Sequence, residues 1–121
     1  MQPLVAKLVG GQVVDMTNQN QISMKINNVA ATVNPSGFGF QFTNIKIKVG
    51  TTITWTNVSA APHTVTGQGT SDAKFNTGSP ILTQGDAGAA SVFTFTFTTP
   101  GTYDYYCTLH PSMVAQITVV A

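Results

Sequence analysis

Hydrophobic and polar residues alternate one by one along most of the chain. The alternation is clearest at residues 22–26, 45–49, 53–56, 93–98 and 116–119. A period of two predicts β-strands that bury one face and expose the other to water. The polar partner is often Thr, whose β-branched side chain suits the pleated surface of a sheet.

Turn-forming residues separate these stretches at 34–37 (NPSG), 49–50 (VG) and 100–101 (PG). No apolar stripe with a period of 3.6 residues is long enough to predict a helix. We therefore predict an all-β fold, an antiparallel sandwich or barrel. Within the region 67–91, which is rich in Gly, Ser and Thr, we expect a short edge strand at 74–76 and a turn around 85–86.

The length of 121 residues is that of one ordinary domain. We predict a single domain over residues 1–121, and no internal repeat or linker divides it. Residues 1–20 contain a short apolar run followed by Gly, Gln and Asn, so we expect an N-terminal arm or an extra edge strand there.

Charged residues make up only 7% of the chain, with five Lys, four Asp and neither Arg nor Glu. A nucleic-acid-binding domain needs a basic face, which five scattered Lys do not form, so we expect no nucleic-acid partner. The single Cys excludes an internal disulfide, a four-Cys zinc site and an iron–sulfur cluster. The two His leave room for one small metal site.

No stretch reaches the ~18 consecutive apolar residues of a membrane span, so we expect no transmembrane segment. The start, MQPLVAKLVGGQVV, has neither the continuous apolar core nor the Ala-x-Ala cleavage site of a signal peptide. We expect either that the protein stays in the cytosol or that an export signal or anchor is missing from this sequence.

The segment with the clearest chemistry is 100–113, PGTYDYYCTLHPSM, in which Cys107, His110 and Met113 lie three residues apart. Pro111 and the flanking alternation argue against a helix, so we interpret the segment as a tight loop between two strands. The second histidine, His63, follows an Ala-Pro pair far back in the sequence.

Each of these four residues alone is more typical of an inert core or surface position, and only their combination indicates a metal site. One thiolate, two imidazoles and a weak axial thioether are the donors of electron-transfer copper sites. Structural zinc prefers Cys and His alone, and non-haem iron needs two His and a carboxylate, for which the loop offers only Asp104. Copper is therefore the metal that fits best.

These segments resemble the cupredoxins, the type 1 or blue copper proteins. The stretch GTYDYYCTLHPSM is similar to their Cys-His-Met ligand loop, and its short gaps resemble amicyanins more than plastocyanins or pseudoazurins. IKVGTTITWTN followed by APHTV is similar to the strand and first-His segment of the family. FNTG and VFTFTFTTPG are similar to its later strands, so the resemblance covers about residues 38–120.

The resemblance implies a Greek-key β-sandwich of about eight strands with one copper ion that cycles between Cu(I) and Cu(II). Its implied ligands are His63, Cys107 and His110 in the equatorial positions and Met113 in the axial position. The implied function is that of a soluble one-electron carrier and not an enzyme.

By the same resemblance we expect a monomer located in the periplasm or elsewhere outside the cytoplasm. Its partners would be redox proteins such as a c-type cytochrome, a dehydrogenase or an oxidase. They would dock at the surface around His110, whose expected neighbours are Ala61, Pro62, Leu109, Pro111 and Ser112.

Two positions depart from the family pattern. Leu109 stands where relatives often have Pro, and we hypothesise that its N–H bonds the Cys107 sulfur. Thr64 stands where the family commonly has Asn, and a hydroxyl bond between Thr64 and Thr108 is the substitute we expect for the usual link between the ligand loops.

Three other functions stay open at this point. The chain could be a cupredoxin module of a larger copper enzyme or respiratory complex, although such enzymes need further His-rich copper sites. It could be a copper-handling protein, or a sandwich adhesion domain without metal. Addition of Cu(II) distinguishes an electron carrier or a copper-enzyme module from the other two, because a thiolate–copper site gives strong visible absorption. A colourless protein would reject both the carrier and the enzyme module.

Overall fold

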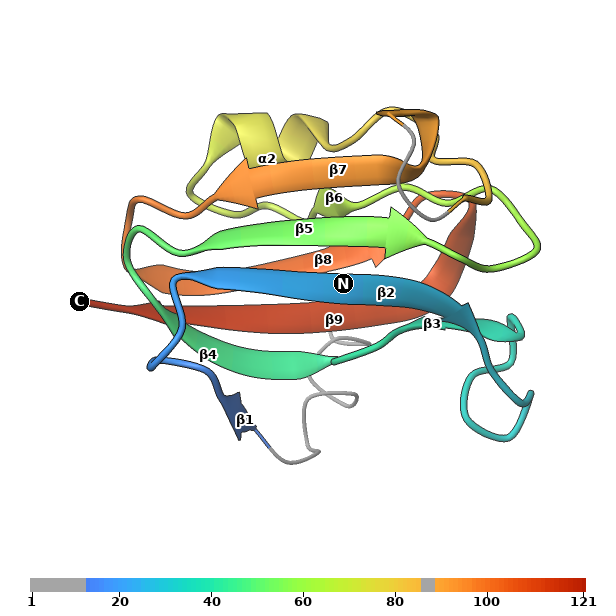
Figure 1. The fold of residues 1–121 in the computed structure, drawn as a ribbon, viewed down its shortest axis with the longest axis horizontal. Coiled ribbons are helices and arrows are strands. Elements are labelled where there is room, and N and C mark those ends of the chain that lie inside the picture. Colours follow the sequence, from blue (N-terminus) through green and yellow to red (C-terminus); the bar gives the residue numbers. More distant parts are fainter. Residues whose placement is uncertain (1–12, 86–88) are drawn as a thin grey trace.

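The structure is a computed structural model that describes residues 13–85 and 89–121. Strands dominate this part of the chain (Figure 1). They are β1 (Val14–Asp15), β2 (Gln21–Asn28), β3 (Phe38–Phe40), β4 (Asn44–Lys48), β5 (Thr52–Asn57), β6 (Thr66–Gly67), β7 (Val92–Thr96), β8 (Gly101–Cys107) and β9 (His110–Val120). The helix α2 (Ala73–Thr77) and the 3-10 turn η1 (Ala89–Ser91) lie between β6 and β7.

The strands form two sheets, as predicted for an all-β sandwich. One sheet has the order β1-β4-β9-β8-β6 and the other the order β3-β2-β5-β7. The expected antiparallel arrangement holds for four strand pairs, but β1–β4, β4–β9 and β2–β5 are parallel, so both sheets are mixed. Alternation reports which face of a strand is buried, and it carries no information about strand direction.

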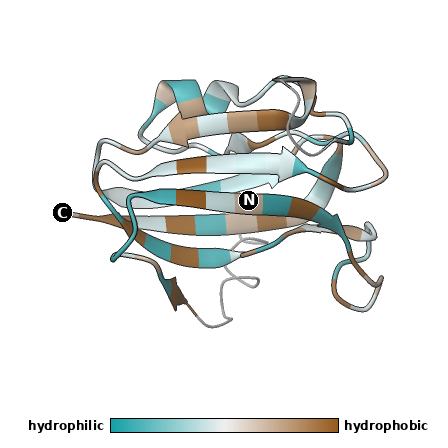
Figure 2. Ribbon diagram, viewed as in Figure 1, coloured by the Kyte–Doolittle hydropathy of each residue, from teal (hydrophilic) through white to brown (hydrophobic). Residues whose placement is uncertain are grey.

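The core lies between the sheets and takes its buried residues from both. Figure 2 shows hydrophobic and hydrophilic residues alternating along the strands. Ile22, Met24 and Ile26 of β2 are buried while their polar neighbours face outward. Trp55 on β5 is fully buried, and its indole N–H donates to the Tyr105 hydroxyl of the opposite sheet at 3.3 Å. Val49, which the alternation places inside, is 40% exposed because β4 ends at Lys48.

The predicted edge strand at 74–76 is instead part of the helix α2. The Asp72 side chain caps this helix by accepting hydrogen bonds from the backbone N–H groups of Lys74 and Phe75. Gly78 ends it with a positive φ of 81°. Only Phe75 of the helix is buried, so a single turn leaves no periodic apolar stripe that the sequence could reveal.

The N-terminal prediction is tested only from residue 13 onward. Val14 and Asp15 form β1, an edge strand paired in parallel with β4. The rest of the expected arm, residues 1–12, lies outside the described residues, as does Asp86 of the expected turn. The single-domain assignment of residues 1–121 stays a prediction. None of the helices in the described ranges has the length and apolar character to cross a membrane.

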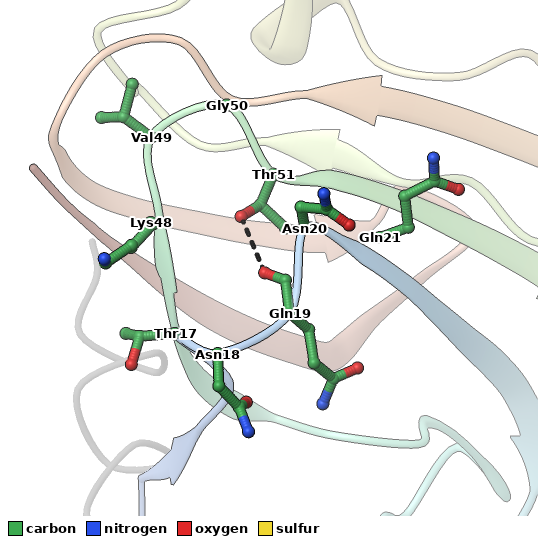
Figure 3. A pocket seen from close by; sticks show the side chains of 9 residues that line it. All are labelled: Thr17, Asn18, Gln19, Asn20, Gln21, Lys48, Val49, Gly50 and Thr51. Carbon is green, nitrogen blue, oxygen red and sulfur yellow. Dashed lines mark hydrogen bonds between the residues drawn. The ribbon is translucent and has the colours of Figure 1, made fainter.

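A polar pocket lies at the end of the sandwich where β2 and β5 begin and β4 ends (Figure 3). It is lined by Thr17, Asn18, Gln19, Asn20, Gln21, Lys48, Val49, Gly50 and Thr51. Thr51 closes its inner side by donating a hydrogen bond from Oγ1 to the Gln19 carbonyl at 3.4 Å. His63 follows the opposite end of β5, and His110 begins β9, whose far end pairs with Lys48 beside the pocket, so the pocket is remote from the predicted metal ligands.

Candidate metal centre

The predicted ligand loop is the connection between β8 and β9. Cys107 is the last residue of β8 and pairs with His110, the first residue of β9, across a two-residue turn. Before this pair the register shifts, because Tyr106 lies opposite Val114. Three residues of β9, among them Met113, are therefore left without a partner on β8 and bulge from the ladder.

His63 reaches the same place from the segment that follows β5. An isolated bridge holds its backbone, since the His63 N–H donates to the Leu82 carbonyl at 3.0 Å and the Leu82 N–H donates back at 2.7 Å. The imidazole is completely buried. Two separate backbone bonds thus fix the position from which the His63 ring enters the site.

Asn57, the last residue of β5, fixes the loop that leads to His63, and the sequence pattern did not reveal this role. Its buried amide donates to the carbonyls of Ala61 at 2.8 Å and Leu82 at 2.7 Å. Its Oδ1 accepts from the Ser59 N–H at 3.0 Å and from the Ser59 hydroxyl at 2.7 Å. The only sequence signal is a polar residue at an inward-facing position of a strand.

The structure brings three of the four predicted ligands together around the sulfur of Cys107. The Sγ atom lies 3.5 Å from Nδ1 of His63 and 3.6 Å from Nδ1 of His110. All three candidate ligand atoms lie within 4.8 Å of one another. Met113 is 1% exposed and lies in the bulge three residues after His110.

Burial decides the protonation of His63. Desolvation, followed by the repulsion of His110, lowers the pKa of His63 from 6.5 to about 4. The ring is therefore neutral at pH 7, with a free nitrogen lone pair. Its Nε2 is buried without a hydrogen-bond partner in the described part of the chain. The ring is therefore held by packing and by the contact of its Nδ1 with the Cys107 sulfur.

The sulfur accepts a hydrogen bond from Thr64. The Thr64 backbone nitrogen lies 3.4 Å from Sγ. The hypothesis that the Leu109 N–H makes this bond was therefore wrong, because Thr64 is the donor. Leu109 is exposed in the two-residue turn, and among the described residues its N–H makes no hydrogen bond to the sulfur.

The expected link between Thr64 and Thr108 is confirmed. Their hydroxyl oxygens lie 3.0 Å apart, and the Thr108 N–H donates to the Thr64 hydroxyl at 2.9 Å. Thr66 adds a third bond to the same oxygen at 3.1 Å. One buried hydroxyl thus joins the His63 segment to the Cys107 turn.

Phe38 of β3 is a second residue that the sequence pattern did not reveal. Its ring centroid lies 4.8 Å from that of His63 and 5.0 Å from that of His110. The two imidazole centroids are themselves 4.7 Å apart. The sequence shows only an aromatic residue directly after the predicted turn at 34–37, so its neighbours could not be known without the fold.

The donors present suit a soft or borderline metal ion. A buried thiol, two imidazoles and a thioether three residues further along the chain match copper, whereas the hard cations prefer oxygen ligands. The uncharged Nδ1 of His63, directed at the sulfur, is the observation that makes the cluster a fitting metal site.

Comparison with known proteins agrees with this chemistry. Residues 27–120 match the family model of copper-binding proteins of the plastocyanin/azurin family. The chain belongs to this family. The resemblance to cupredoxins, the all-β sandwich and a copper cofactor are therefore confirmed.

Two relatives within the plastocyanin/azurin family are amicyanins. The chain is 35% identical over 80 residues to amicyanin-alpha of Methylorubrum extorquens, which is 66% of this chain and 63% of the relative. It is 32% identical over 90 residues to amicyanin of Paracoccus denitrificans, with 74% and 65% covered. The matched part is therefore slightly less than two thirds of each amicyanin.

A solved structure, a purple cupredoxin from Nitrosopumilus maritimus, superimposes with a TM-score of 0.63. It is 33% identical, and the match covers 82% of this chain and 99% of the other. Nearly the whole of the purple cupredoxin is therefore matched by part of this chain, so the two share the fold over that part.

Proposed function

We propose that this protein is a one-electron carrier that uses a single copper ion held by His63, Cys107, His110 and Met113. The two imidazoles and the thiolate would be the strong ligands and the Met113 thioether the weak one. When bound, the ion supplies a centre that can gain or lose one electron.

The observation that carries the proposal is the meeting of two Nδ1 atoms at one buried sulfur. They arrive from distant parts of the sequence, at 3.5 and 3.6 Å from Sγ. Burying the Cys107 thiol and the His63 imidazole beside the partly exposed ring of His110 costs free energy without a ligand to compensate them. A resident metal ion is the simplest compensation.

The frame around the ligands favours fast electron transfer, because it leaves them little room to move. The bridge to Leu82 fixes His63, the ladder between β8 and β9 fixes Cys107, and the Thr64 hydroxyl joins the two segments. A site that changes little between oxidation states needs little reorganisation when an electron arrives or leaves.

The surface at this end suits brief contacts with a redox partner. His110 is partly exposed, and exposed apolar side chains surround the end of the sandwich: Val33 at 72%, Ile81 at 56% and Leu109 at 44%. The loops 29–37, 58–63, 79–85 and 107–113 contain neither Lys nor Asp. We propose that the partner that docks here is a c-type cytochrome, a dehydrogenase or an oxidase. We also propose that the protein acts as a monomer.

Catalysis and copper handling are less well supported. Both histidines of the sequence are used in the proposed site, so this chain alone has none for the second copper centre of an oxidase. A copper-handling protein needs ligands that exchange metal readily, whereas Cys107 is completely buried. We further propose that the protein works in the periplasm or elsewhere outside the cytoplasm, as the family resemblance implies.

The test is titration of the metal-free protein with Cu(II), followed by voltammetry. We expect one equivalent to bind, with an intense visible thiolate-to-copper band and a reversible one-electron wave. Cys107→Ser should lose the band completely, because no other thiol is present. Met113→Leu should keep the colour and change the potential. A colourless wild-type protein would overturn the proposal.

A further inference from the structure

Phe38 and the two histidines form a compact triangle of rings. The three centroid distances are 4.7, 4.8 and 5.0 Å, and the Phe38 ring is tilted by 66° and 53° against the two imidazoles. Such tilted and edge-to-face contacts are the favourable geometries for aromatic pairs. Phe38 therefore packs against both imidazoles and closes off movement of either ring in its own direction.

The strand β3 directs Phe38 to this position. Phe38 pairs with Asn28 of β2, and Phe40, two residues on, points to the same side of the sheet. Phe40 is buried against Tyr105, at a centroid distance of 4.8 Å. The packing of Phe40 in the core thus fixes the side of the strand from which Phe38 reaches the histidines.

The turn before β3 is held by the side chain of Asn34. The Asn34 Oδ1 accepts from the Ser36 N–H at 3.0 Å and from the Ser36 hydroxyl at 2.7 Å. The Asn34 carbonyl accepts from the Gly37 N–H at 2.9 Å, and Gly37 has a positive φ of 83°. The turn is therefore a defined structure that leads directly into Phe38.

The same Asn34 side chain also reaches the ligand strand. Its amide donates to the Ser112 carbonyl at 2.9 Å, and the Ser112 hydroxyl lies 3.2 Å from the Asn34 Oδ1. Ser112 lies in the bulge between His110 and Met113, which has no partner on β8. Asn34 supplies side-chain hydrogen bonds to a stretch that the sheet itself leaves unpaired.

We propose that the segment 34–38 is a brace for the partly exposed ligand, in which Phe38 and Asn34 are positioning residues that hold the His110 side chain against the Cys107 sulfur. This inference rests on the proposed copper site for its consequence, a slow loss of the ion. The brace itself is a property of the protein without metal. At one end Phe38 packs on the imidazole rings. At the other end the Asn34 side chain donates to the Ser112 carbonyl and accepts from the Ser112 hydroxyl.

The first experiment measures copper release to an excess of chelator from variants of the copper-loaded protein. We expect Phe38→Ala to release copper about tenfold faster than wild type, since two aromatic contacts are lost. Phe38→Leu, which restores most of the volume, should lie between the two. Phe95→Ala is the matched control, because Phe95 is also partly buried but packs against Phe75 and Phe97.

Asn34→Ala should also speed copper release, while Asn18→Ala, an exposed Asn at the opposite end, should leave the rate unchanged. Asn34→Asp keeps an acceptor for the Ser112 hydroxyl but loses the donor to its carbonyl, so its rate should lie between those of wild type and Asn34→Ala. Equal rates in wild type, Phe38→Ala and Asn34→Ala would overturn the brace.

The second experiment uses the metal-free protein, and NMR couplings report the rotamers of the His110 side chain. We expect one rotamer in wild type and averaging among rotamers in Phe38→Ala, with the unfolding temperature as a check that the fold persists. A single rotamer in folded Phe38→Ala would reject the proposal. If wild type bound no copper, the proposed function would fail, and this measurement would still decide whether the brace exists.

Discussion

The two ends of the sandwich use polar side chains in opposite ways. At the end that carries the candidate metal centre, Asn57, Ser59 and Thr64 are buried and hydrogen-bonded, while Val33, Ile81 and Leu109 are exposed. At the opposite end, amide side chains line an open pocket (Figure 3), and the turn at Lys48–Thr51 is short.

This difference shows where the chain needs rigidity. Both ends rest on the same apolar core, so hydrophobic burial does not distinguish them. A buried polar network is rigid only if its members are satisfied, and breaking it is expensive. Side-chain bonds of this kind join segments at the metal end that no sheet ladder joins, and substitutions there should cost more than their counterparts at the opposite end.

The largest effect is expected from Asn57→Ala. It removes two donors from the carbonyls of Ala61 and Leu82 and the acceptor of both Ser59 donors. We expect a loss of about 4 kcal/mol in the free energy of unfolding, measured by denaturant titration of the metal-free protein. Asn18→Ala should stay within about 0.5 kcal/mol of wild type. Similar values for the two variants would show that the ends do not differ.

The second effect is a pH dependence that originates at His63. Its pKa is about 4 in the folded protein and near 6.5 when unfolded, so the unfolded state binds the proton first as the pH falls. Stability of the metal-free protein is full above pH 6.5 and should decrease by roughly 3 kcal/mol towards pH 4. Thermal unfolding across this range measures the slope, and His63→Gln should flatten it.

Two glycines with positive φ allow a comparison between a packed and an open position. A Cβ at Gly78 would lie 2.6 Å from the Thr66 hydroxyl, whereas one at Gly50 would meet nothing within 4 Å. Gly78→Ala should destabilise by roughly 3 kcal/mol through overpacking and backbone strain together. Gly50→Ala should cost about 1 kcal/mol, from strain alone. Calorimetric unfolding of both variants distinguishes the two contributions.

A smaller effect is expected from Thr64→Val, which keeps the shape of the side chain and removes its hydroxyl. The Thr108 N–H loses its acceptor, so the cost should be about 1–2 kcal/mol. Thr64→Ser should restore most of it. Thr54→Val breaks the exposed Thr54–Thr94 hydroxyl pair and should change stability by less than about 0.5 kcal/mol. Equal costs at positions 64 and 54 would contradict the role given to burial.

The smallest effect concerns salt. The net charge is +1, and the loops at the metal end carry no Lys or Asp. Oxidation of the copper-loaded, reduced protein by hexacyanoferrate(III) should therefore change by less than about twofold between low salt and physiological ionic strength. A steep dependence in stopped-flow measurements would show that charge, and not the apolar surface, controls encounter at this end.

The candidate site was predictable to the extent that its chemistry is local in sequence. Cys107, His110 and Met113 follow one another on a short loop, and His63 was the only other imidazole available. The residues that hold the ligands were not predictable in this way. Asn57, Asn34 and Phe38 act on groups far along the chain, and hydrogen bonds such as that between residues 34 and 112 have no counterpart in any local pattern.

The fold was also predictable only where its features are local in sequence. Alternation identified β2, β4, β5, β7 and the second half of β9, because burial of one face of a strand imposes a period of two on the sequence itself. It could not predict the parallel pairing of β2 with β5, nor the single helical turn at Ala73–Thr77 that a cap and a glycine define.

The amino-acid sequence alone determined which faces of the strands are apolar and which donor atoms exist, since both are properties of neighbouring residues. Only the tertiary structure decided which imidazole nitrogens meet the sulfur, which amide donates to that sulfur and which ring lies against the histidines. The reason is physical: these contacts arise when two sheets pack together, and packing selects partners by space rather than by order along the chain.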